Sequence, residues 1–338
     1  MALRSRIAGT GMSVPDRVVT NADLTRWMDT SEEWIEQRTG IKERRWVEEG
    51  QRPSDLARAA CLQALEDAGL DPADVASDID CILLATLSGE ADFPGTSFFL
   101  HEALDAGEIP CIDLRAQCSG FLYALQLADA LLVAGRHERI LVVGCEVHST
   151  GLDISTEGRD VTVIFGDGAG AVVLEAVDAE AGPGLLEVRV HAEGKFARKL
   201  WTEAPGSAAH PRIDQAAIAA RKHFPYMDGR FVFKHAVTRM PEVLLETLGA
   251  AHLDLEDVDL FLFHQANLRI NEFVAQKLEI PPEKVLNNIQ RLGNCSAAAL
   301  PILLAEASRS GRLQAGQVVS LTAFGSGFTW GSAALRWG

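Results

Sequence analysis

One cysteine near the middle of the chain has the sequence context of a nucleophile. Cys118 follows a strand-like apolar run (109–114) and directly precedes an apolar helical run (121–133). The positive end of a helix macrodipole favours thiolate over thiol, and the thiolate is the nucleophilic form. The pattern therefore favours acyl-thioester chemistry at Cys118. The alternative reading of the local context is a small buried residue, because free cysteines are common in protein cores.

Two later side chains could act together with this thiol. Acyl transfer needs a group that holds or moves a proton, and donors for the oxyanion that develops. His264 follows the apolar run 260–263 and stands among the amides Gln265 and Asn267, which suggests a place at the rim of a sheet. Considered alone, His264 could equally bond to a loop carbonyl. Asn294 follows a glycine in a turn and could simply cap the next helix.

A glycine cluster near the end of the chain offers backbone donors. Gly325-Ser326-Gly327 follows the strand-like run 318–323. Its N–H groups could stabilise an oxyanion. Considered alone, the cluster predicts only a tight turn.

Helices and apolar strands alternate along the chain and must position these groups. In the first half, helices are expected over 54–68 and 121–135, strands over 79–86 and 140–147, and two strands around a glycine-rich turn over 161–174. In the second half, helices are expected over 233–248, 268–278 and 297–308, and strands over 258–263 and 318–323. This alternation predicts largely parallel, buried sheets flanked by helices.

A short repeat suggests that the chain is duplicated. LDPADV at 70–75 matches LDLEDV at 253–258, and both segments follow a predicted helix and precede a predicted strand. The matching context makes an internally duplicated α/β chain the expected architecture.

Residues 185–226 interrupt the alternation with a stretch rich in Ala, Arg and His that also contains prolines. We expect a strand followed by a long loop or helical excursion, which is a common way to shape substrate entry. The predicted divisions are an N-terminal half with the nucleophilic cysteine (1–175), a connecting strand and insertion (176–230), and a C-terminal half with the histidine and asparagine (231–338).

Composition limits the class of partner. The 338 residues carry a formal net charge of −16, which argues against nucleic acid or an anionic membrane as a partner. No apolar run approaches the roughly 18 to 20 residues of a membrane span, and residues 1–11 lack a signal-peptide pattern, so a cytoplasmic location is expected. The six cysteines form neither a CxxC pair nor a Cys/His cluster, so no disulfide and no metal site is expected.

Taken together, these segments resemble the β-ketoacyl-acyl-carrier-protein synthase III family of the thiolase-like superfamily over nearly the whole chain. The resemblance is carried, in this order, by TNADL (20–24), TSEEWI (30–35), RTGI (38–41), the Cys118 segment, FGDGAG (165–170), HQANLRI (264–270), GN (293–294) and FGSGFTWG (324–331). It implies an α/β fold, the thiolase-like duplicated αβαβα layered fold with two similar halves.

The resemblance implies a Cys-His-Asn triad at Cys118, His264 and Asn294. Cys118 would take an acyl group from acyl-CoA. Malonyl-acyl carrier protein would then lose CO2, and the enolate, held by His264 and Asn294, would attack the acyl group. The backbone N–H groups of Cys118 and Ser326 would stabilise the acyl-transfer oxyanion, with the Ser326 side chain facing the site. Phe324 would shield the enolate from water, and no cofactor is implied because acyl-CoA is a substrate.

The resemblance also implies a binding site for CoA. Trp34, Arg38 and Arg159 match positions that hold the adenine and phosphates, since an indole can stack on adenine and Arg pairs with phosphate. Asn267 matches a residue that bonds the pantetheine arm. The alternative for Trp34 is an ordinary contact of an amphipathic helix.

Partner proteins are implied as well. Lys234, Arg269 and Lys277 could form the local basic patch that an acidic acyl carrier protein requires on a chain of net charge −16. Phe93 matches a dimer-interface loop whose ring closes the acyl pocket of the partner subunit, so a homodimer is expected. The alternative is a surface turn with Phe93 tucked into its own subunit.

Two departures from the family pattern leave the substrate open. Gln117, beside the nucleophile at the acyl pocket, takes a position that is commonly small, and 195–226 is longer than in compact members. Both favour a specialised member. The alternative functions are an acyltransferase of secondary metabolism, moving an acyl group from CoA or carrier protein to a hydroxyl or amine, and a non-catalytic partner of a synthase. The intact triad favours condensation, because an enolate needs both His264 and Asn294.

Overall fold

Two five-stranded mixed sheets with one shared topology form the framework of the protein. The structure is a computed structural model that describes residues 2–338. The first sheet has the order β1-β7-β6-β4-β5 and the second the order β12-β11-β13-β14-β8. Their strands are β1 (Leu3–Ser13), β4 (Cys81–Ala85), β5 (Cys111–Leu114), β6 (Arg139–Glu146), β7 (Gly168–Asp178), β8 (Gly184–Ala192), β11 (Leu260–Phe263), β12 (Val285–Leu286), β13 (Val318–Gly325) and β14 (Thr329–Arg336).

Read from the opposite edge, the second sheet repeats the first strand for strand. β8, β14, β13, β11 and β12 stand where β1, β7, β6, β4 and β5 stand. In both sheets, the first three strands pair antiparallel and the last three pair parallel. The LDPADV and LDLEDV segments precede β4 and β11, which are equivalent strands. The predicted duplicated fold with two similar halves is confirmed.

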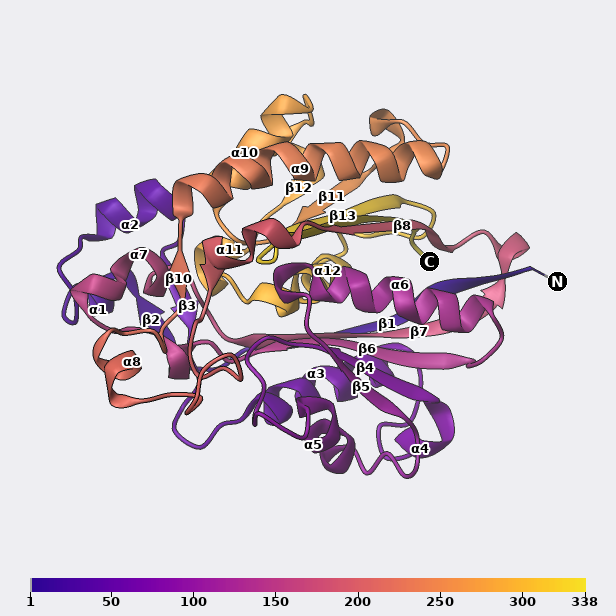
Figure 1. Ribbon diagram of the computed structural model, residues 1–338. Coiled ribbons are helices and arrows are strands. Elements are labelled where there is room, and N and C mark those ends of the chain that lie inside the picture. Colours follow the sequence, from indigo (N-terminus) through magenta and orange to yellow (C-terminus); the bar gives the residue numbers. More distant parts are fainter. Residues whose placement is uncertain (1) are drawn as a thin grey trace.

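Helices complete a five-layer stack, as Figure 1 shows. α3 (Pro53–Asp67) and α5 (Thr96–Ala103) cover the outer face of the first sheet, and α9 (Gly229–Ala250) and α10 (Leu268–Lys277) cover the outer face of the second. α6 (Gly120–Val133) and α12 (Ala299–Arg309) lie between the two sheets. The shorter helices are α1 (Asn21–Leu24), α2 (Glu32–Thr39), α4 (Val75–Asp78), α7 (Arg159–Thr162), α8 (Gln215–Ala219) and α11 (Ile289–Leu292).

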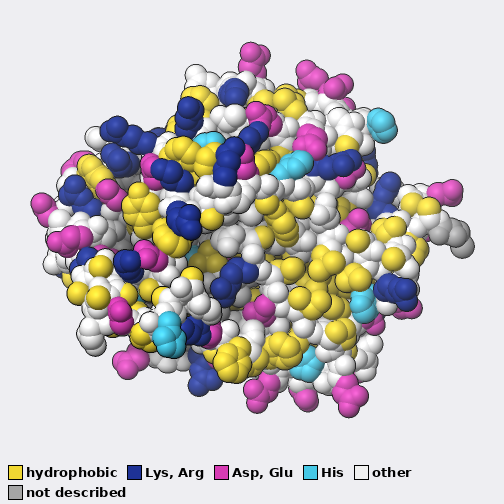
Figure 2. Space-filling model, viewed as in Figure 1, with side chains coloured by type: hydrophobic (Ala, Val, Ile, Leu, Met, Phe, Trp, Pro, Cys, Tyr) yellow, Lys and Arg dark blue, Asp and Glu magenta, His cyan; other side chains and the backbone are white. Residues whose placement is uncertain are grey.

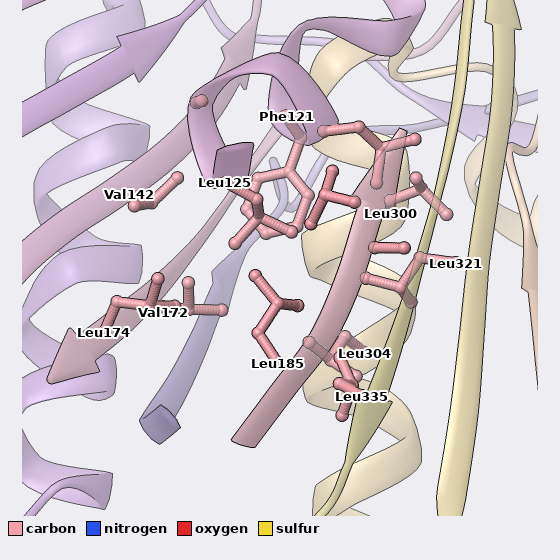
Figure 3. Packing of buried hydrophobic residues seen from close by; sticks show 14 of the residues in the cluster. Phe121, Leu125, Val142, Val172, Leu174, Leu185, Leu300, Leu304, Leu321 and Leu335 are labelled. Atoms are coloured by element: carbon pink, nitrogen blue, oxygen red, sulfur yellow. The ribbon is translucent and has the colours of Figure 1, made fainter. Parts of the chain in front are cut away.

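The middle layer holds the largest apolar cluster. In Figure 3, Phe121 and Leu125 of α6 lie between Val142 of the first sheet and Leu300 of α12, with Leu321 of the second sheet beyond. The four-residue spacing of Phe121 and Leu125 puts both on one face of the helix. Burying each such side chain contributes roughly 1.5–3 kcal/mol. This packing fixes the two halves against each other.

The structure corrects two expectations. The sheets are not largely parallel, because the short turn from β13 to β14 and the returning segment from β6 to β7 are not crossovers, and each produces an antiparallel pair. The stretch 161–174 does not form two strands, because it begins in α7 and only β7 is a strand. The Thr162 hydroxyl stabilises the helical turn by donating to the carbonyl of Asp153.

The stretch 176–230 contains more than a connection. Its first strand, β8, is the edge strand of the second sheet. The insertion that follows contains a 3-10 helix η5 (Gly194–Lys199), α8 and the two-residue strands β9 (Leu200–Trp201) and β10 (Tyr226–Met227), which pair with each other. β2 (Val18–Thr20) and β3 (Glu43–Arg45) form a further small hairpin. None of the helices within residues 2–338 has the length and apolar character needed to cross a membrane.

Candidate active site

The three predicted catalytic residues line one cavity of about 810 Å3. Cys118, His264 and Asn294 come from three different segments, one in the first half of the chain and two in the second. Phe324 lines the same cavity, and Trp34, Arg38, Asn267 and Arg269 also lie along its wall. The fold thus brings together groups that lie far apart in the sequence: Cys118 and Asn294 are 176 residues apart, and Trp34 and Phe324 are 290 residues apart.

Cys118 sits in a sharp turn at the start of α6. The turn is the 3-10 helix η1 (Gln117–Ser119), and Gln117 has φ +47°, a left-handed conformation that is uncommon for a residue other than glycine. The backbone N–H groups of Cys118 and Ser326 both favour negative charge on the sulfur and so lower the pKa of the thiol. These are the two groups predicted as oxyanion donors, and the segment that carries Ser326 lies directly against Cys118.

The charge state of Cys118 differs from the prediction. The helix N-terminus led us to expect a favoured thiolate, but Cys118 is only 7% exposed and burial raises the pKa of its thiol to about 11. Burial outweighs the hydrogen bonds to the sulfur, because a thiolate loses its hydration there. The resting group is therefore a thiol that must lose its proton during the reaction.

His264 is held by its backbone and leaves its ring free. The buried strand β11 ends at Phe263, and the His264 N–H donates to the carbonyl of Thr322 at 2.8 Å. Burial lowers the pKa of His264 to about 3, so its imidazole is neutral. Neither ring nitrogen has a hydrogen-bond partner within residues 2–338. A neutral ring offers one donor and one acceptor to a substrate.

Asn294 has a fixed amide orientation. It follows Gly293 (φ +69°) and pairs with the loop before β7: its N–H donates to Ile164, and its carbonyl accepts from Gly166. The side-chain Oδ1 accepts from the N–H of Ser296 at 2.8 Å. A backbone N–H can only donate, so Oδ1 takes this end and the Nδ2 donor remains for a ligand.

The loop after β13 forms the wall opposite Cys118. A Cβ on Gly325 would lie 2.9 Å from the Cys118 Cβ, so only glycine allows this close approach. Phe324 packs edge-to-face on Phe328 with ring centroids 4.9 Å apart. The Ser326 hydroxyl was expected to face the site; instead, it donates to the carbonyl of Leu200 in β9.

Two guanidinium groups lie close to the Trp34 ring, which lines the cavity. Ser31 caps α2 and accepts from the Trp34 N–H, which fixes the helix start. The Cζ atoms of Arg38 and Arg159 lie 5.2 and 5.1 Å from the Trp34 ring centroid. Arg159 also donates to the Asp29 carbonyl at 2.5 Å. Both distances are within the range of cation–π contacts. Trp34 also packs against the apolar cluster that contains Ile35, as the alternative of an ordinary helix contact predicts.

Asn267 and Arg269 join α10 to α2. Asn267 caps α10 by accepting from the Arg269 N–H and donates from Nδ2 to the Arg38 carbonyl at 3.1 Å. Arg269 donates to the carbonyls of Glu36 and Gln37 and forms an ion pair with Glu272. Its donors are therefore largely occupied.

Lys234 and Lys277 are exposed on α9 and α10, and neither forms an ion pair within the part of the chain that the structure describes. In Figure 2, Lys and Arg side chains gather on the upper left of the face, where α2 and the start of α9 lie in Figure 1. Sequence reasoning missed Arg230, which is exposed and lines the cavity mouth. Its place in the first turn of α9, two residues after the Asp228 cap and four before Lys234, could have indicated it.

Several predicted residues do not line the cavity, namely Phe93, Gln117, Arg159, Lys234, Lys277 and Ser326. Phe93 is 84% exposed in the loop after β4, which contradicts the alternative that it is tucked into its own subunit. Gln117 is half-buried in the Cys118 turn.

No group of three or more His, Cys, Asp or Glu residues among 2–338 is arranged to hold a metal ion. Sequence reasoning also missed Glu146 and Ser296, which are buried next to Cys118.

Comparison with known proteins agrees with this geometry. Family models described as 3-oxoacyl-[acyl-carrier-protein (ACP)] synthase III and as its C-terminal part match residues 112–194 and 248–337. The chain is 42% identical to the β-ketoacyl-[acyl-carrier-protein] synthase III of Roseiflexus sp. (strain RS-1) over 339 residues, covering 100% of this chain and 99% of the relative. It is 44% identical to that of Xanthomonas campestris pv. campestris over 335 residues, 98% of each chain.

A solved structure leads to the same family. The crystal structure of 3-oxoacyl-[acyl-carrier-protein] synthase III from Aquifex aeolicus VF5 superimposes with a TM-score of 0.88 at 40% identity, covering 98% of this chain and 100% of that one. Similarity in both sequence and fold thus extends over the full chain. The chain belongs to the 3-oxoacyl-[acyl-carrier-protein] synthase III family.

Proposed function

We propose that the protein condenses an acyl-CoA with malonyl-acyl carrier protein through an acyl-Cys118 intermediate. The products are β-ketoacyl-acyl carrier protein, CoA and CO2. One observation carries the proposal: a single cavity holds a buried thiol, a neutral histidine whose ring nitrogens have no partner within residues 2–338, and an asparagine whose Oδ1 is occupied so that Nδ2 remains for a ligand. The names of the relatives supply the acyl carrier protein as a substrate.

Acylation begins at the Cys118 thiol. The neutral His264 ring accepts the proton as the sulfur attacks the thioester carbonyl, and the C–S bond to CoA then breaks as the departing CoA sulfur takes a proton. The backbone N–H groups of Cys118 and Ser326 stabilise the intermediate oxyanion. Losing one such donor typically raises a barrier by about 3 to 4 kcal/mol.

Condensation needs a second set of donors. When the malonyl C–C bond breaks, CO2 leaves and the electron pair forms an enolate. Asn294 Nδ2 and one His264 nitrogen donate to the enolate oxygen. Asn294 Nδ2 is available because Oδ1 takes the hydrogen bond from Ser296, and neither ring nitrogen of His264 has a partner within residues 2–338. The Phe324 ring excludes water, which favours loss of the carboxylate as neutral CO2. The enolate carbon attacks the acyl carbonyl and Cys118 leaves.

The cavity mouth suits CoA and carrier protein. The Trp34 ring would stack on the adenine and Arg38 and Arg159 would pair with its phosphates, while Asn267 would bond the pantetheine arm. Acidic carrier protein would dock through Lys234, Lys277 and Arg230, cations around the entrance of an otherwise acidic chain. Arg269 contributes charge and fixes α2, since its donors are taken up internally.

A homodimer in the cytoplasm is the expected working form. β5 is the edge strand of the first sheet, and Phe93, Phe98 and Ile112 expose large apolar side chains on β5, α5 and the preceding loop. Pairing of this edge with a second copy would cover them, and Phe93 would then reach the partner's acyl pocket beside Gln117. Sedimentation of Phe93→Asp against the unchanged protein tests this: an unaltered dimer would contradict the role of Phe93.

Sequential labelling tests the reaction. The protein is incubated with radiolabelled acyl-CoA, desalted, and then given malonyl-acyl carrier protein while protein-bound label and CO2 are followed. Cys118→Ser should carry no label, and Asn294→Ala should become labelled but release little CO2. Labelled Cys118→Ser protein would contradict the nucleophile, and acylation without malonyl-dependent CO2 would indicate transfer to another acceptor.

A further inference from the structure

The sharp turn that presents Cys118 occurs twice in the molecule. In the first half, Gln117 has φ +47° and η1 leads into α6. In the second half, Ser296 has φ +45° and the 3-10 helix η8 (Ser296–Ala298) leads into α12. Ser296 therefore corresponds to Gln117, and Ala297 to Cys118. The second turn lacks a nucleophile and lies against the first.

The second turn brings a hydroxyl to the nucleophile. Ser296 Oγ lies 3.6 Å from Cys118 Sγ and donates a hydrogen bond to it. Both side chains are buried. A hydroxyl in this position can accept a hydrogen bond from the thiol and donate one to the thiolate, because the O–H bond rotates to suit its partner.

The backbone around Ser296 is held on both sides. Its N–H donates to Asn294 Oδ1 at 2.8 Å, and the Ala297 N–H donates to Glu146 Oε1 at 3.3 Å. A Cβ on Gly144 would lie only 2.3 Å from the Ala297 carbonyl oxygen, so the turn fits closely on β6. A non-glycine residue in the left-handed region is strained and persists where its surroundings enforce it, often at functional sites.

Glu146 forms hydrogen bonds both with this turn and with a loop in the first half of the molecule. Its carboxylate, at the end of β6, accepts from Thr86 Oγ1, from the N–H groups of Leu87 and Ser88, and from Ser88 Oγ, as well as from Ala297. It is fully buried. One carboxylate thus joins the loop after β4 to the turn that carries Ser296.

We propose that Ser296 is a further catalytic residue, which stabilises the developing Cys118 thiolate by hydrogen bonding, and that Glu146 positions it through the Ala297 amide. The proposal rests on the proposed role of Cys118 as the nucleophile. It assigns a function to a hydroxyl outside the Cys-His-Asn triad.

The electrostatics explain why this donor matters. Burial raises the pKa of Cys118 to about 11, the hydrogen bond from Ser296 is the largest opposing effect, and the Glu146 carboxylate adds to the increase. Of the other titratable side chains that line the cavity, His264 is neutral, and the rest are Arg38, Asp160, Tyr226, Asp228, Arg230 and Arg269. A hydrogen bond to a charged group changes such an equilibrium by roughly tenfold or more.

Alkylation of Cys118 by iodoacetamide, followed by intact mass across pH, tests the proposal without any acyl-CoA. Ser296→Ala and Ser296→Gly both remove the hydroxyl, and glycine also relieves the left-handed strain. Both should slow alkylation at pH 8 by about tenfold and move the profile to higher pH. Ser119→Ala, which removes a buried hydroxyl bonded to Thr329 Oγ1, is the matched control, and Cys118→Ser is the blank.

An unchanged pH profile of alkylation in both Ser296 variants would overturn the role of the hydroxyl. So would a shift of the same size in Ser119→Ala, or a normal pH profile in Ser296→Gly alone. In a Glu146→Ala background, Ser296→Ala should slow alkylation less, because no side-chain acceptor then holds the Ala297 N–H and with it the Ser296 hydroxyl. An equal loss in both backgrounds would overturn the positioning role of Glu146. A protein that alkylates as expected but accepts no acyl-CoA would contradict the proposed function and leave this inference intact.

Discussion

Burial of Glu146 should make the protein less stable as the pH rises toward neutrality. Its carboxyl accepts five hydrogen bonds, yet burial outweighs them and raises its pKa from 4.5 to about 7. Between these two values the folded state holds a proton that the unfolded chain releases. The free energy of unfolding therefore falls as the pH rises through this window.

The size of this effect follows from the two pKa values. Each pKa unit corresponds to about 1.36 kcal/mol, so the full shift amounts to roughly 3 kcal/mol, of which about 2 kcal/mol falls between pH 5 and 7.5. The Glu146→Gln side chain cannot titrate and should lose this part of the pH dependence. Glu49→Gln, at an exposed position, controls for the loss of one negative charge.

Chemical denaturation at fixed protein concentration measures the effect. Wild-type protein and both variants are unfolded at several pH values between 5 and 7.5, and the slopes of unfolding free energy against pH are compared. Glu146→Gln should have the shallower slope and Glu49→Gln the wild-type slope. A wild-type slope in Glu146→Gln would refute the reasoning and show that the five donors keep the carboxylate ionised throughout.

Three further predictions concern the cavity and the core. Gly325→Ala should cut the acylation rate by about 100-fold, because its Cβ would push Cys118 out of place; labelling with acyl-CoA measures this, and normal labelling would contradict the close approach. Trp34→Ala should raise the KM for acyl-CoA about tenfold and leave kcat nearly unchanged, since stacking on a base is worth roughly 1–3 kcal/mol; an unchanged KM in steady-state kinetics would remove Trp34 from the CoA site. Leu125→Ala should lower the unfolding free energy by about 2–5 kcal/mol in denaturation, whereas Val133→Ala, at the exposed end of α6, should change it by less than about 1 kcal/mol; equal losses would contradict the central core.

The sequence was most informative where local pattern and burial agree. The apolar runs that became β6, β11 and β13 are buried strands, so their composition alone identified them. The six-residue repeat before β4 and β11 indicated the duplication. His264 was found because it directly ends a buried strand, and Cys118 because it begins a helix.

The remaining features depend on contacts that no local pattern encodes. The antiparallel pairing of β7 with β6 follows from how the chain returns through α7, which a run of apolar residues does not reveal. The pKa of Cys118 was predicted in the wrong direction, because the helix terminus is a local feature and burial is a tertiary one. Glu146 carried a signal that could have been used: a lone acid closing the apolar run of β6.

Because the active site is divided between the two halves, the catalytic rate should depend on how the layers are aligned. Cys118 lies just before α6 and Asn294 just before α12, and both helices contribute to one apolar cluster in the middle layer. A slip of about 1 Å between the helices would misplace the reacting groups and cost about 100-fold in rate while most of the core stayed buried. Heating should therefore abolish activity at temperatures below those that unfold the protein. Substitutions at the α6–α12 contact should lower activity at temperatures where secondary structure is still intact.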